Sequence, residues 1–555
     1  MSPDVVAAQA WQFAQQGLAA LQLGQTHAAI ACYQHSLALA PNNPDVLHAL
    51  GVLLMRQLKI DASLRLLERA VELTQGQVPA IKQNYGWALS LLMVPLPSSS
   101  SIERAELAIR LRMLRDCIER IVGSDGTSAA PLARLSADEI GLLRAALRGG
   151  LAAVLEPQQL KSMAQWLWAD AARAPLDDDG IEFVGYARAE IGLGENLRSL
   201  IRAVASTSLA PQVSASATEV PRGVRCDDAS IDGFIDGRGF ATRIVCVNPD
   251  RLSLAIEQHT LCRYPQAYRV GFWFWELEQI PRYWVEQAQW FDEIWAATDF
   301  VADAIRRDVT ERPVVKIRTP VAVPILERAY TRAEFGLREN CCLFMFSFAY
   351  ASFATRKNPA ATIRAFRVAF PLGTESVQLL IKSSQSEFYA AQRDALVALA
   401  AADSRIIFLD QHLTRAQFNG LQSTIDCYIS LHRCEGLGLG LAECMAQGKP
   451  VIATAYSGNL EFMNHDNSML VDYHLIPVRE GEFPDYIGQV WAEPSVEHAA
   501  SLMRSVYSRP QRAAEMGQVG ARYIAEHFSP NATGLSILER YNSIRALRGK
   551  SPVNV

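Results

Sequence analysis

Residues 430–463 are S-L-H-R-C-E-G-L-G-L-G-L-A-E-C-M-A-Q-G-K-P-V-I-A-T-A-Y-S-G-N-L-E-F-M, and the organisation of the chain can be worked out from them. A short apolar run at 424–431 predicts a buried strand. Residues 441–447 have a helical pattern that Gly448 terminates, and residues 451–454 predict the next buried strand. A strand, a glycine-rich turn, a helix and a strand in succession indicate an α/β domain.

Two carboxylates flank the glycine-rich turn. Seven residues separate Glu435 from Glu443. Between them, Gly436, Gly438 and Gly440 allow a tight bend and a close approach of the backbone to a ligand. The free N–H groups and the dipole at the start of the following helix favour an anion such as a diphosphate. Because carboxylates accept hydrogen bonds from hydroxyls, a sugar nucleotide suits this arrangement with its ribose, diphosphate and sugar.

The spacing of the two glutamates resembles the donor-site signature of retaining glycosyltransferases of family 4, which have the GT-B fold. The segments Y-S-G-N-L-E-F-M (456–463) and V-D-Y-H-L-I-P-V (471–478) resemble one bacterial branch of that family. The resemblance extends over roughly residues 180–543. It implies that Glu435 holds the hydroxyls of the transferred sugar and that Glu443 holds the ribose. Taken alone, the stretch also suits an ordinary strand-turn-helix in which acidic side chains favour the helix start.

The length of 555 residues predicts several domains. The expected fold class is α/β: GT-B, with two Rossmann-like domains facing a cleft, preceded by an all-α tetratricopeptide-like solenoid. We expect helical repeats at 1–125, a helical connector at 126–178, an N-terminal Rossmann-like domain on the acceptor side at 179–322 and a C-terminal donor domain at 323–530. The C-terminal helix and tail at 531–555 are expected to cross back to the N-terminal Rossmann-like domain.

Composition narrows the function classes. Hydrophobic residues make up 50% of the chain and charged residues 20%, which is typical of a soluble globular protein. The net charge of -5 gives no reason to expect a nucleic-acid partner. Ten cysteines without a C-x-x-C pair or zinc spacing indicate a reducing compartment. With no signal peptide and no apolar run that could cross a bilayer, we expect a cytoplasmic protein, and peripheral contact with the inner face of the membrane remains open.

The N-terminal region shows a helical repeat. Gly17 and Tyr33 are followed thirty-four residues later by Gly51 and Leu67, which is the period of a tetratricopeptide repeat. A third copy follows with its register off by one. Residues 10–95 could dock a protein partner, mediate self-association or only cap the catalytic part, and the sequence leaves these alternatives open.

The first α/β domain is predicted from alternating apolar and helical segments. An exposed linker is expected at 176–180 and a helix at 195–205, and the expected strands are 181–185, 243–247, 268–273, 293–296 and 314–317. Gly192 and Gly194 lie in the loop after the first strand. The resemblance places this loop toward the donor phosphates or the acceptor, and the alternative is a turn that needs positive φ.

The segment G-F-W-F-W-E-L-E-Q-I-P-R-Y-W, residues 271–284, is the most unusual of this domain. Four aromatic residues precede Glu276 at the end of a predicted strand, where ligands of parallel sheets bind. Aromatic faces stack on sugars, so Glu276 is our acceptor-side candidate and a candidate base. The alternative is an aromatic core with Glu278 exposed to solvent.

The second domain begins after a predicted hinge at 319–324. A buried strand at 343–348 is followed by Arg356 and Lys357 beside a predicted helix start. The helix dipole disfavours cations there, so a bound anion is indicated, although two solvated surface cations remain an alternative. The resemblance assigns Lys357 to the donor diphosphate. Ser352 and Phe353 stand where the family usually has an arginine, and Arg356 could substitute for it.

Three further elements are donor-site candidates. Lys382 ends a predicted strand at 377–381. His412 lies in the loop 410–414, where the resemblance places recognition of the nucleotide base. A turn after the strand 451–454 can offer backbone N–H groups to phosphate oxygens; its residues are Ser457, Gly458 and Asn459.

These residues predict a glycosyltransferase that moves a sugar from a nucleoside diphosphate sugar to a hydroxyl on a glycan or a protein. Retention, a GDP-mannose-like donor and a cell-surface polysaccharide product are implied by the resemblance. The predicted catalytic residues are Glu435, Lys357 and Glu276. No cofactor and no metal site are expected, so Lys357, Arg356 and the turn N–H groups would stabilise the leaving diphosphate. The alternatives are a non-catalytic scaffold on a degenerate GT-B fold and a GT-B phosphorylase with lysine-bound pyridoxal phosphate.

Overall fold

The computed structural model describes residues 3–22, 25–56, 60–74, 78, 81, 84, 176–209, 213–217, 226, 228–235, 239–252, 267–326 and 328–553. The expected third repeat and the helical connector fall almost wholly outside these residues, and both stay predictions. The helical repeats and the sheet domains are described separately below.

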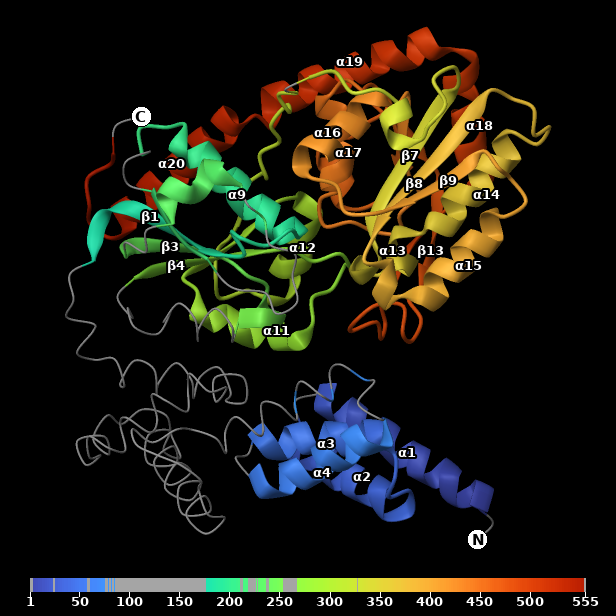
Figure 1. Cartoon of the computed structure of the whole chain (residues 1–555). Coiled ribbons are helices and arrows are strands. Elements are labelled where there is room, and N and C mark those ends of the chain that lie inside the picture. Colours follow the sequence, from blue (N-terminus) through green and yellow to red (C-terminus); the bar gives the residue numbers. More distant parts are fainter. Residues whose placement is uncertain are drawn as a thin grey trace, which may run out of the picture. The chain divides into compact units, whose positions relative to one another are not determined.

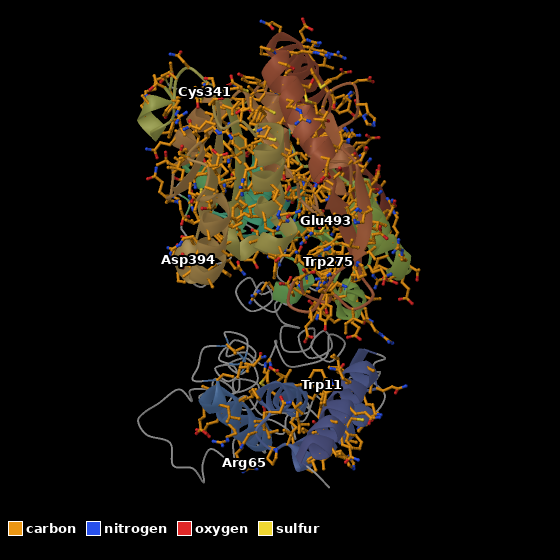
Figure 2. All side chains as sticks on the ribbon, turned by 90° about the vertical axis from the view of Figure 1, so that its right-hand side faces the viewer. Trp11, Arg65, Trp275, Cys341, Asp394 and Glu493 are labelled. Carbon is orange, nitrogen blue, oxygen red and sulfur yellow. The ribbon has the colours of Figure 1, made fainter. Side chains whose placement is uncertain are left out.

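The N-terminal repeats are helical hairpins, formed by α1 (Pro3–Gln22), α2 (Thr26–Leu39), α3 (Pro44–Arg56) and α4 (Ile60–Leu73) (Figure 1). In each hairpin a glycine of the first helix lies against a large side chain of the second. A Cβ atom added at Gly17 would lie 2.7 Å from the ring of Tyr33, and one added at Gly51 would lie 2.8 Å from Leu67. The thirty-four-residue period therefore repeats one helix-helix contact, which confirms the first two repeats. Trp11 on α1 is 57% exposed (Figure 2).

The first sheet has the strand order β2-β1-β3-β4-β5-β6, and the ladders recorded between its neighbours are parallel. Its strands are β1 (Asp177–Gly185), β2 (Val213–Ala217), β3 (Phe240–Cys246), β4 (Tyr268–Trp273), β5 (Glu293–Ala296) and β6 (Val314–Lys316). The bounds of β4 and β5 are those predicted, because both are continuous buried apolar runs. β2 was not predicted, since V-S-A-S-A carries little apolar signal.

The helices of this part of the chain are α9 (Gly192–Ala205), η5 (Ala229–Phe234), η6 (Pro249–Arg251), α11 (Arg282–Gln287), η8 (Ala288–Trp290) and α12 (Asp299–Asp308). Thr298 caps α12, because its side chain accepts a hydrogen bond from the N–H of Val301 at 3.2 Å.

β1 corrects the prediction of an exposed linker before residue 181. The strand begins at Asp177, and its first carboxylates pair with the C-terminal end of the chain. Asp178 lies 2.5 Å from Lys550 and 3.2 Å from Arg548, while Asp179 lies 2.6 Å from Arg545. A local pattern cannot predict this pairing, because the cationic partners lie more than three hundred residues away in the sequence.

The second sheet has the strand order β12-β11-β10-β7-β8-β9, and all its recorded ladders are parallel. Its strands are β7 (Cys342–Ala349), β8 (Val377–Ser384), β9 (Ile406–Asp410), β10 (Cys427–Ser430), β11 (Val451–Thr454) and β12 (Met469–Val471). The strand order is that of a Rossmann fold: β8 and β9 are added on one side of β7, and β10, β11 and β12 on the other. The strand order therefore reverses between β7 and β10. An antiparallel hairpin of β13 (Tyr473–Pro477) and β14 (Val490–Pro494), which was not predicted, follows.

Helices connect these strands, and α18, α19 and α20 form a helical C-terminal region. The elements are η9 (Ala333–Phe335), η10 (Tyr350–Ser352), α13 (Ala354–Lys357), α14 (Pro359–Ala369), η11 (Ser386–Phe388), α15 (Ala390–Ala400), α16 (Arg415–Thr424), α17 (Leu439–Ala446), η12 (Gly458–Glu461), α18 (Val496–Ser508), α19 (Pro510–His527) and α20 (Pro530–Leu547). Residue 424 ends α16 rather than beginning a strand, so β10 is shorter than predicted.

The last helix returns to the first domain, as predicted. α20 packs against α9 so closely that a Cβ atom at Gly534 would lie 2.3 Å from the carbonyl oxygen of Ala203 (Figure 1). Arg540 of α20 pairs with Glu293, a fully buried carboxylate at the start of β5. A single chain segment thus joins the two sheet domains through α19 and α20.

Arg243 and Glu182 form a buried ion pair between β3 and β1, with side chains 3% and 2% exposed and 2.7 Å between Nε and Oε2. Arg243→Met should destabilise the domain by about 3–5 kcal/mol, because it removes a cation that pairs with the buried Glu182 carboxylate. Urea unfolding followed by the fluorescence of the buried Trp273 and Trp295 would measure this loss. The double variant Arg243→Met/Glu182→Leu should recover most of it, and equal unfolding midpoints for Arg243→Met and the unmodified protein would contradict the prediction.

None of the helices in the described part of the chain has the length and apolar character needed to cross a membrane.

Candidate active site

The predicted site residues meet at the point between β7 and β10 where the strand order of the second sheet reverses. β7 and β10 are neighbours in the sheet, and their carboxyl ends lie side by side. Arg356 and Lys357 follow β7, and Glu435 follows β10. Ligands of doubly wound sheets bind at this reversal, outside the carboxyl ends of the strands. The structure therefore brings together three residues that were predicted from two separate motifs.

Glu435 is held between the two cations. Its Oε1 accepts from Lys357 Nζ at 2.5 Å and its Oε2 accepts from Arg356 Nη1 at 3.0 Å. The glutamate is only 7% exposed. Burial by itself would raise the pKa of Glu435, but Lys357 and Arg356 lower it well below the ordinary value. Glu435 is thus a buried, ionised carboxylate at neutral pH.

Arg356 extends this cluster to the first domain. It is 4% exposed, which excludes the alternative of a solvated surface cation. Its guanidinium donates to the carbonyl oxygen of Cys434 at 3.0 Å and lies 3.5 Å from Glu276 Oε1. Glu276, the acceptor-side candidate, therefore lies beside the same cations as Glu435. The substitution of Arg356 for the arginine that is absent at Ser352 and Phe353 stays a prediction.

The backbone before these cations is strained. Phe353 has φ +60°, a conformation that is rare for a bulky residue. Its carbonyl oxygen accepts from the N–H groups of Arg356 at 2.9 Å and Lys357 at 3.2 Å. Asn358, with φ +55°, then caps α14 at the predicted helix start, through its side chain. The strained turn points both cations at Glu435, and such strain is common at functional sites.

The glycine-rich turn and the turn after β11 are locked together. The N–H of Glu435 donates to Ser457 Oγ at 2.8 Å, and the N–H of Gly458 donates to the carbonyl oxygen of Glu435 at 2.9 Å. A Cβ atom at Gly458 would lie 2.2 Å from the carbonyl oxygen of Gly436. The N–H of Gly458 is therefore engaged by the protein, which corrects the prediction that this turn offers it to phosphate.

A buried histidine supports these turns and was not singled out from the sequence. His432 bonds Ser430 Oγ at 3.1 Å and Asn459 Oδ1 at 3.1 Å. Burial lowers the pKa of His432, although Glu435 opposes the shift. Asn459 is fully buried, and its Nδ2 donates to the carbonyl oxygen of Thr454 at 3.0 Å. Asn459 thus shapes the turn with its side chain rather than reaching a ligand.

The start of α17 keeps the geometry of an anion site. Gly438 is the N-cap residue with φ +88°, and its cap has no side-chain hydrogen bond. Gly440 lies inside the helix, where an added Cβ would approach Tyr428 Oη to 3.1 Å. Positive φ at Gly448 ends the helix one residue after its C-cap, as predicted.

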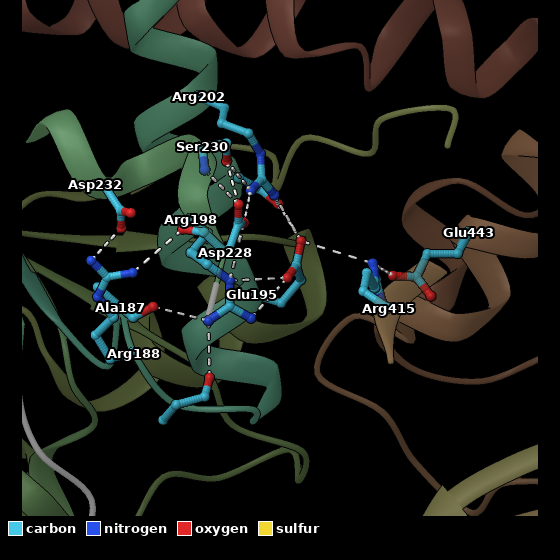
Figure 3. A network of polar contacts seen from close by, with 12 residues as sticks. Ala187, Arg188, Glu195, Arg198, Arg202, Asp228, Ser230, Asp232, Arg415 and Glu443 are labelled. Carbon is cyan, nitrogen blue, oxygen red and sulfur yellow. Dashed lines mark hydrogen bonds and ion pairs between the residues drawn. The ribbon is translucent and has the colours of Figure 1, made fainter. Parts of the chain in front are cut away.

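Glu443, the predicted ribose ligand, is paired with Arg415 at the start of α16 (Figure 3). Gln422 also donates to Glu443, at 3.4 Å. Arg415 lies in turn 3.8 Å from Glu195 of α9 in the first domain. Sequence analysis missed Arg415 and Glu195, because no local motif connects residues from different domains.

The aromatic segment 271–284 is mainly structural. Trp273 is fully buried and Trp275 is 6% exposed, so these faces belong to the core and are not available for stacking on a sugar. Asn248, after β3, positions the segment by donating to the carbonyl of Phe274 and accepting from its N–H, both at 2.9 Å. Glu278 is not solvated as the alternative assumed, because Tyr456 Oη donates to it at 2.9 Å.

The two glycines after β1 are placed differently from expectation, whereas His412 lies in the predicted loop and its role stays a prediction. Gly192 and Gly194 are helical residues of α9 without positive φ, so the helix begins before residue 195. Gly194 is required by close packing, since an added Cβ would lie 2.3 Å from the carbonyl oxygen of Ala189. The His412 side chain is 57% exposed, and its Nδ1 lies 3.4 Å from Glu190.

Lys382 is an interior residue of β8 rather than its end, and it is 6% exposed. Its Nζ donates to the carbonyl oxygen of Ser383 at 2.6 Å. Burial lowers the pKa of Lys382 to about 8, with Asp410 opposing the shift. Ser347 of β7 is its register partner, and Ser347 Oγ bonds Tyr428 Oη at 2.8 Å. Since register partners share a face, Lys382 lies on the face of the sheet that carries the start of α17.

The two sheet domains touch around this site. Thr298 Oγ1 of the first domain donates to the carbonyl oxygen of Gly436 at 3.0 Å. Glu461, whose side chain is 5% exposed, lies 2.9 Å from Lys316 and 3.2 Å from Arg318. The site is therefore built from both domains. Within the described ranges, no group of three or more His, Cys, Asp and Glu side chains is arranged to hold a metal ion.

The fold is α/β of the GT-B type, with two Rossmann-like parallel-sheet domains facing each other, preceded by helical tetratricopeptide repeats. Residues 351–488 match the family model of glycosyl transferases group 1, and residues 17–57 match a TPR repeat model. Two segments of the chain are thus similar to known families, and the match to glycosyl transferases group 1 lies within the second sheet domain and the hairpin that follows it. No curated protein matches the chain.

Solved structures resemble the chain at low sequence identity. TarM of S. aureus, in complex with fondaparinux, alpha-GlcNAc-glycerol and UDP, is 12% identical, with 56% of this chain and 57% of TarM covered and a TM-score of 0.42. HepE of Anabaena, in complex with UDP and glucose, is 13% identical over 66% of this chain and 99% of HepE, with a TM-score of 0.46. Sucrose-phosphate synthase of Thermosynechococcus elongatus is 14% identical over 66% and 99%, with a TM-score of 0.49. This chain spans little more than half of the length of TarM.

Proposed function

We propose that this protein is a retaining glycosyltransferase that moves a sugar from a nucleoside diphosphate sugar to a hydroxyl acceptor. The observation that carries the proposal is the buried Glu435 between Arg356 and Lys357 at the reversal of the second sheet. The group 1 glycosyltransferase match over residues 351–488 includes all three residues. The resemblance to a bacterial branch of family 4 favours a GDP-mannose-like donor and a cell-surface glycan acceptor.

The charges around Glu435 suggest where the donor diphosphate would bind. Arg356 and Lys357 are balanced by Glu435 and Glu276, so these four side chains carry no net charge. The donor diphosphate would lie at the start of α17, where the N–H groups and helix dipole favour it, with Lys357 between it and Glu435. As the bond to the sugar breaks, negative charge grows on the diphosphate, and a preorganised cation stabilises that charge. Glu435 would then accept hydrogen bonds from the hydroxyls of the sugar.

A residue of the first sheet domain would activate the acceptor hydroxyl. Glu276, in the loop that follows β4, lies 3.5 Å from Arg356 Nη2, whereas Glu435 pairs with Nη1 of the same guanidinium. A carboxylate there can accept the proton of an attacking hydroxyl. Contacts between the domains, such as Thr298 with Gly436, would exclude water and limit hydrolysis of the donor. We assign no cofactor or metal to the reaction.

The proposal is tested by transfer and by donor hydrolysis. A thermal-shift screen of GDP-mannose, UDP-glucose and UDP-N-acetylglucosamine should show one donor that raises the melting temperature. Purified protein should then hydrolyse that donor slowly and transfer its sugar to a suitable acceptor with retained anomeric configuration, observed by NMR. Neither binding nor turnover with any donor would favour the non-catalytic scaffold, and absorbance of a lysine aldimine would favour the phosphorylase.

Lys382 predicts a pH dependence of donor binding. In the described structure no carboxylate lies within ion-pair distance of Lys382, so a diphosphate would be its first strong counter-charge. The lowered pKa of about 8 means that much of the amine is neutral at pH 8–9, whereas a bound anion favours the charged form. Binding should therefore take up a proton near pH 8.5, and affinity should fall by up to about tenfold per pH unit above pH 8.

Calorimetry of nucleoside diphosphate binding in two buffers of different ionisation enthalpy would measure that proton uptake. Lys382→Met should remove the difference between the buffers. The same proton uptake in Lys382→Met would show that another group titrates.

A further inference from the structure

A line of alternating charges connects the two sheet domains (Figure 3). In the first domain, Asp228 lies 2.6 Å from Arg202, and Arg202 lies 2.8 Å from Glu195. Glu195 lies 3.8 Å from Arg415 of the second domain, and Arg415 pairs directly with Glu443. The same nitrogen of Arg415, Nη2, makes both of these last contacts. A small rotation of one side chain could therefore exchange one carboxylate for the other.

The two carboxylates next to Arg415 differ in what else holds them. Glu195 also pairs with Arg198 at 2.8 Å, and Arg198 is anchored on the carbonyl oxygens of Ala187 and Ala189 at 3.1 and 2.9 Å. Glu195 is therefore a rigidly held carboxylate. Within the described residues, Arg415 is the only cation recorded at Glu443, whose side chain is 9% exposed. Glu443 thus depends on Arg415 for its charge balance.

Arg415 is itself poorly placed for a purely structural role. It occupies the first turn of α16, where the helix dipole disfavours a cation, and its side chain is 50% exposed. Its hydrogen bond in this structure goes to the carboxylate that the proposed function assigns to the ribose of the donor. A ribose hydroxyl that approaches Glu443 Oε1 therefore has to compete with Arg415 Nη2 for that oxygen.

We propose that Arg415 is a positioning residue that pairs with Glu443 as in this structure and moves to Glu195 when the ribose of a nucleoside diphosphate takes its place. The inference rests on the proposed function, in which Glu443 binds the ribose. When Arg415 leaves Glu443, Glu195 still balances its charge. The stronger Arg415–Glu195 ion pair then joins the two sheet domains. Nucleotide binding would thereby be linked to contact between α9 and α16.

The proposal predicts opposite effects of removing the two partners. Arg415→Gln frees Glu443 from competition, so calorimetry should show UDP or GDP, whichever the protein binds, binding about threefold to tenfold more tightly. Glu195→Gln removes the second position of Arg415, which then stays on Glu443, so the same nucleotide should bind more weakly by a similar factor. When Arg415→Gln is already present, adding Glu195→Gln should have no further effect on affinity, because Glu195 acts only through Arg415.

Arg504→Gln is the control. It removes the same charge from the exposed surface of α18, where Arg504 donates to the carbonyl oxygen of Val368 at 3.1 Å, and should leave nucleotide affinity unchanged. Thermal unfolding of each variant would confirm that the fold is retained. Weaker binding by Arg415→Gln would overturn the proposal, since Arg415 would then be a ligand of the nucleotide. An equal effect of Glu195→Gln with and without Arg415 would overturn it as well.

Failure of the proposed function would look different. If the unmodified protein binds neither UDP nor GDP, then Glu443 is no ribose ligand and both ideas fall. If nucleotide binds and Glu443→Gln weakens it while the Arg415 and Glu195 variants behave like Arg504→Gln, the proposed function stands and only the role of Arg415 is lost.

Discussion

Glu435→Gln is expected to lower sugar transfer by about a hundredfold to a thousandfold without weakening nucleotide binding. The amide keeps the shape of the side chain but carries no charge, so it cannot balance Arg356 and Lys357 or accept hydrogen bonds through both oxygens. Lys357, freed from its bond to Oε1 at 2.5 Å, becomes available to the diphosphate. Affinity for the nucleoside diphosphate should therefore stay constant or rise while turnover falls, which parallel calorimetry and transfer assays would show.

Glutamine is the right replacement because alanine would disturb the fold. Glu435→Ala leaves two buried cations facing a cavity, and loss of one partner of a buried ion pair costs about 3–5 kcal/mol. Glu435→Gln keeps the volume of the side chain and one accepting oxygen, so it should lose less stability than Glu435→Ala. A folded Glu435→Gln variant that transfers sugar at nearly the normal rate would remove Glu435 from the reaction.

Lys357→Met should weaken nucleoside diphosphate binding by about tenfold to a hundredfold and reduce transfer further. A charge-assisted hydrogen bond is worth about 1.5–3 kcal/mol, and the leaving group gains charge in the transition state, where the cation matters more. Burial and the neighbouring Arg356 lower the pKa of Lys357, while Glu435 opposes this shift and keeps the ammonium ion paired. Titration with UDP and GDP and measurement of kcat would separate the two effects.

Lys550→Met is the matched control, because it removes a lysine charge that pairs with Asp178 at the far end of α20. It should change neither binding nor turnover. Unaltered nucleotide affinity in a folded Lys357→Met variant would contradict the assignment of this lysine to the diphosphate.

Local patterns in the sequence were enough to predict the elements around the site. β4, β5 and β11 have the predicted bounds because each is a short buried apolar run ended by polar or turn residues. The Asn358 cap and the Gly448 stop depend on backbone conformation within a few residues, which sequence patterns record well. The predicted start of β1 was wrong because it depends on Asp178 meeting cations from the other end of the chain.

The same distinction applies to the site. The sequence determined that Glu435 and Glu443 flank a glycine-rich turn and that Lys357 stands just before a helix start, since each lies in a motif of adjacent residues. Only the tertiary structure decided that β7 lies beside β10, which pairs Lys357 with Glu435, and that Arg415 covers Glu443. Strand order and ion pairs between domains arise from packing of segments far apart in the chain, and no local pattern of residues encodes the distance between them.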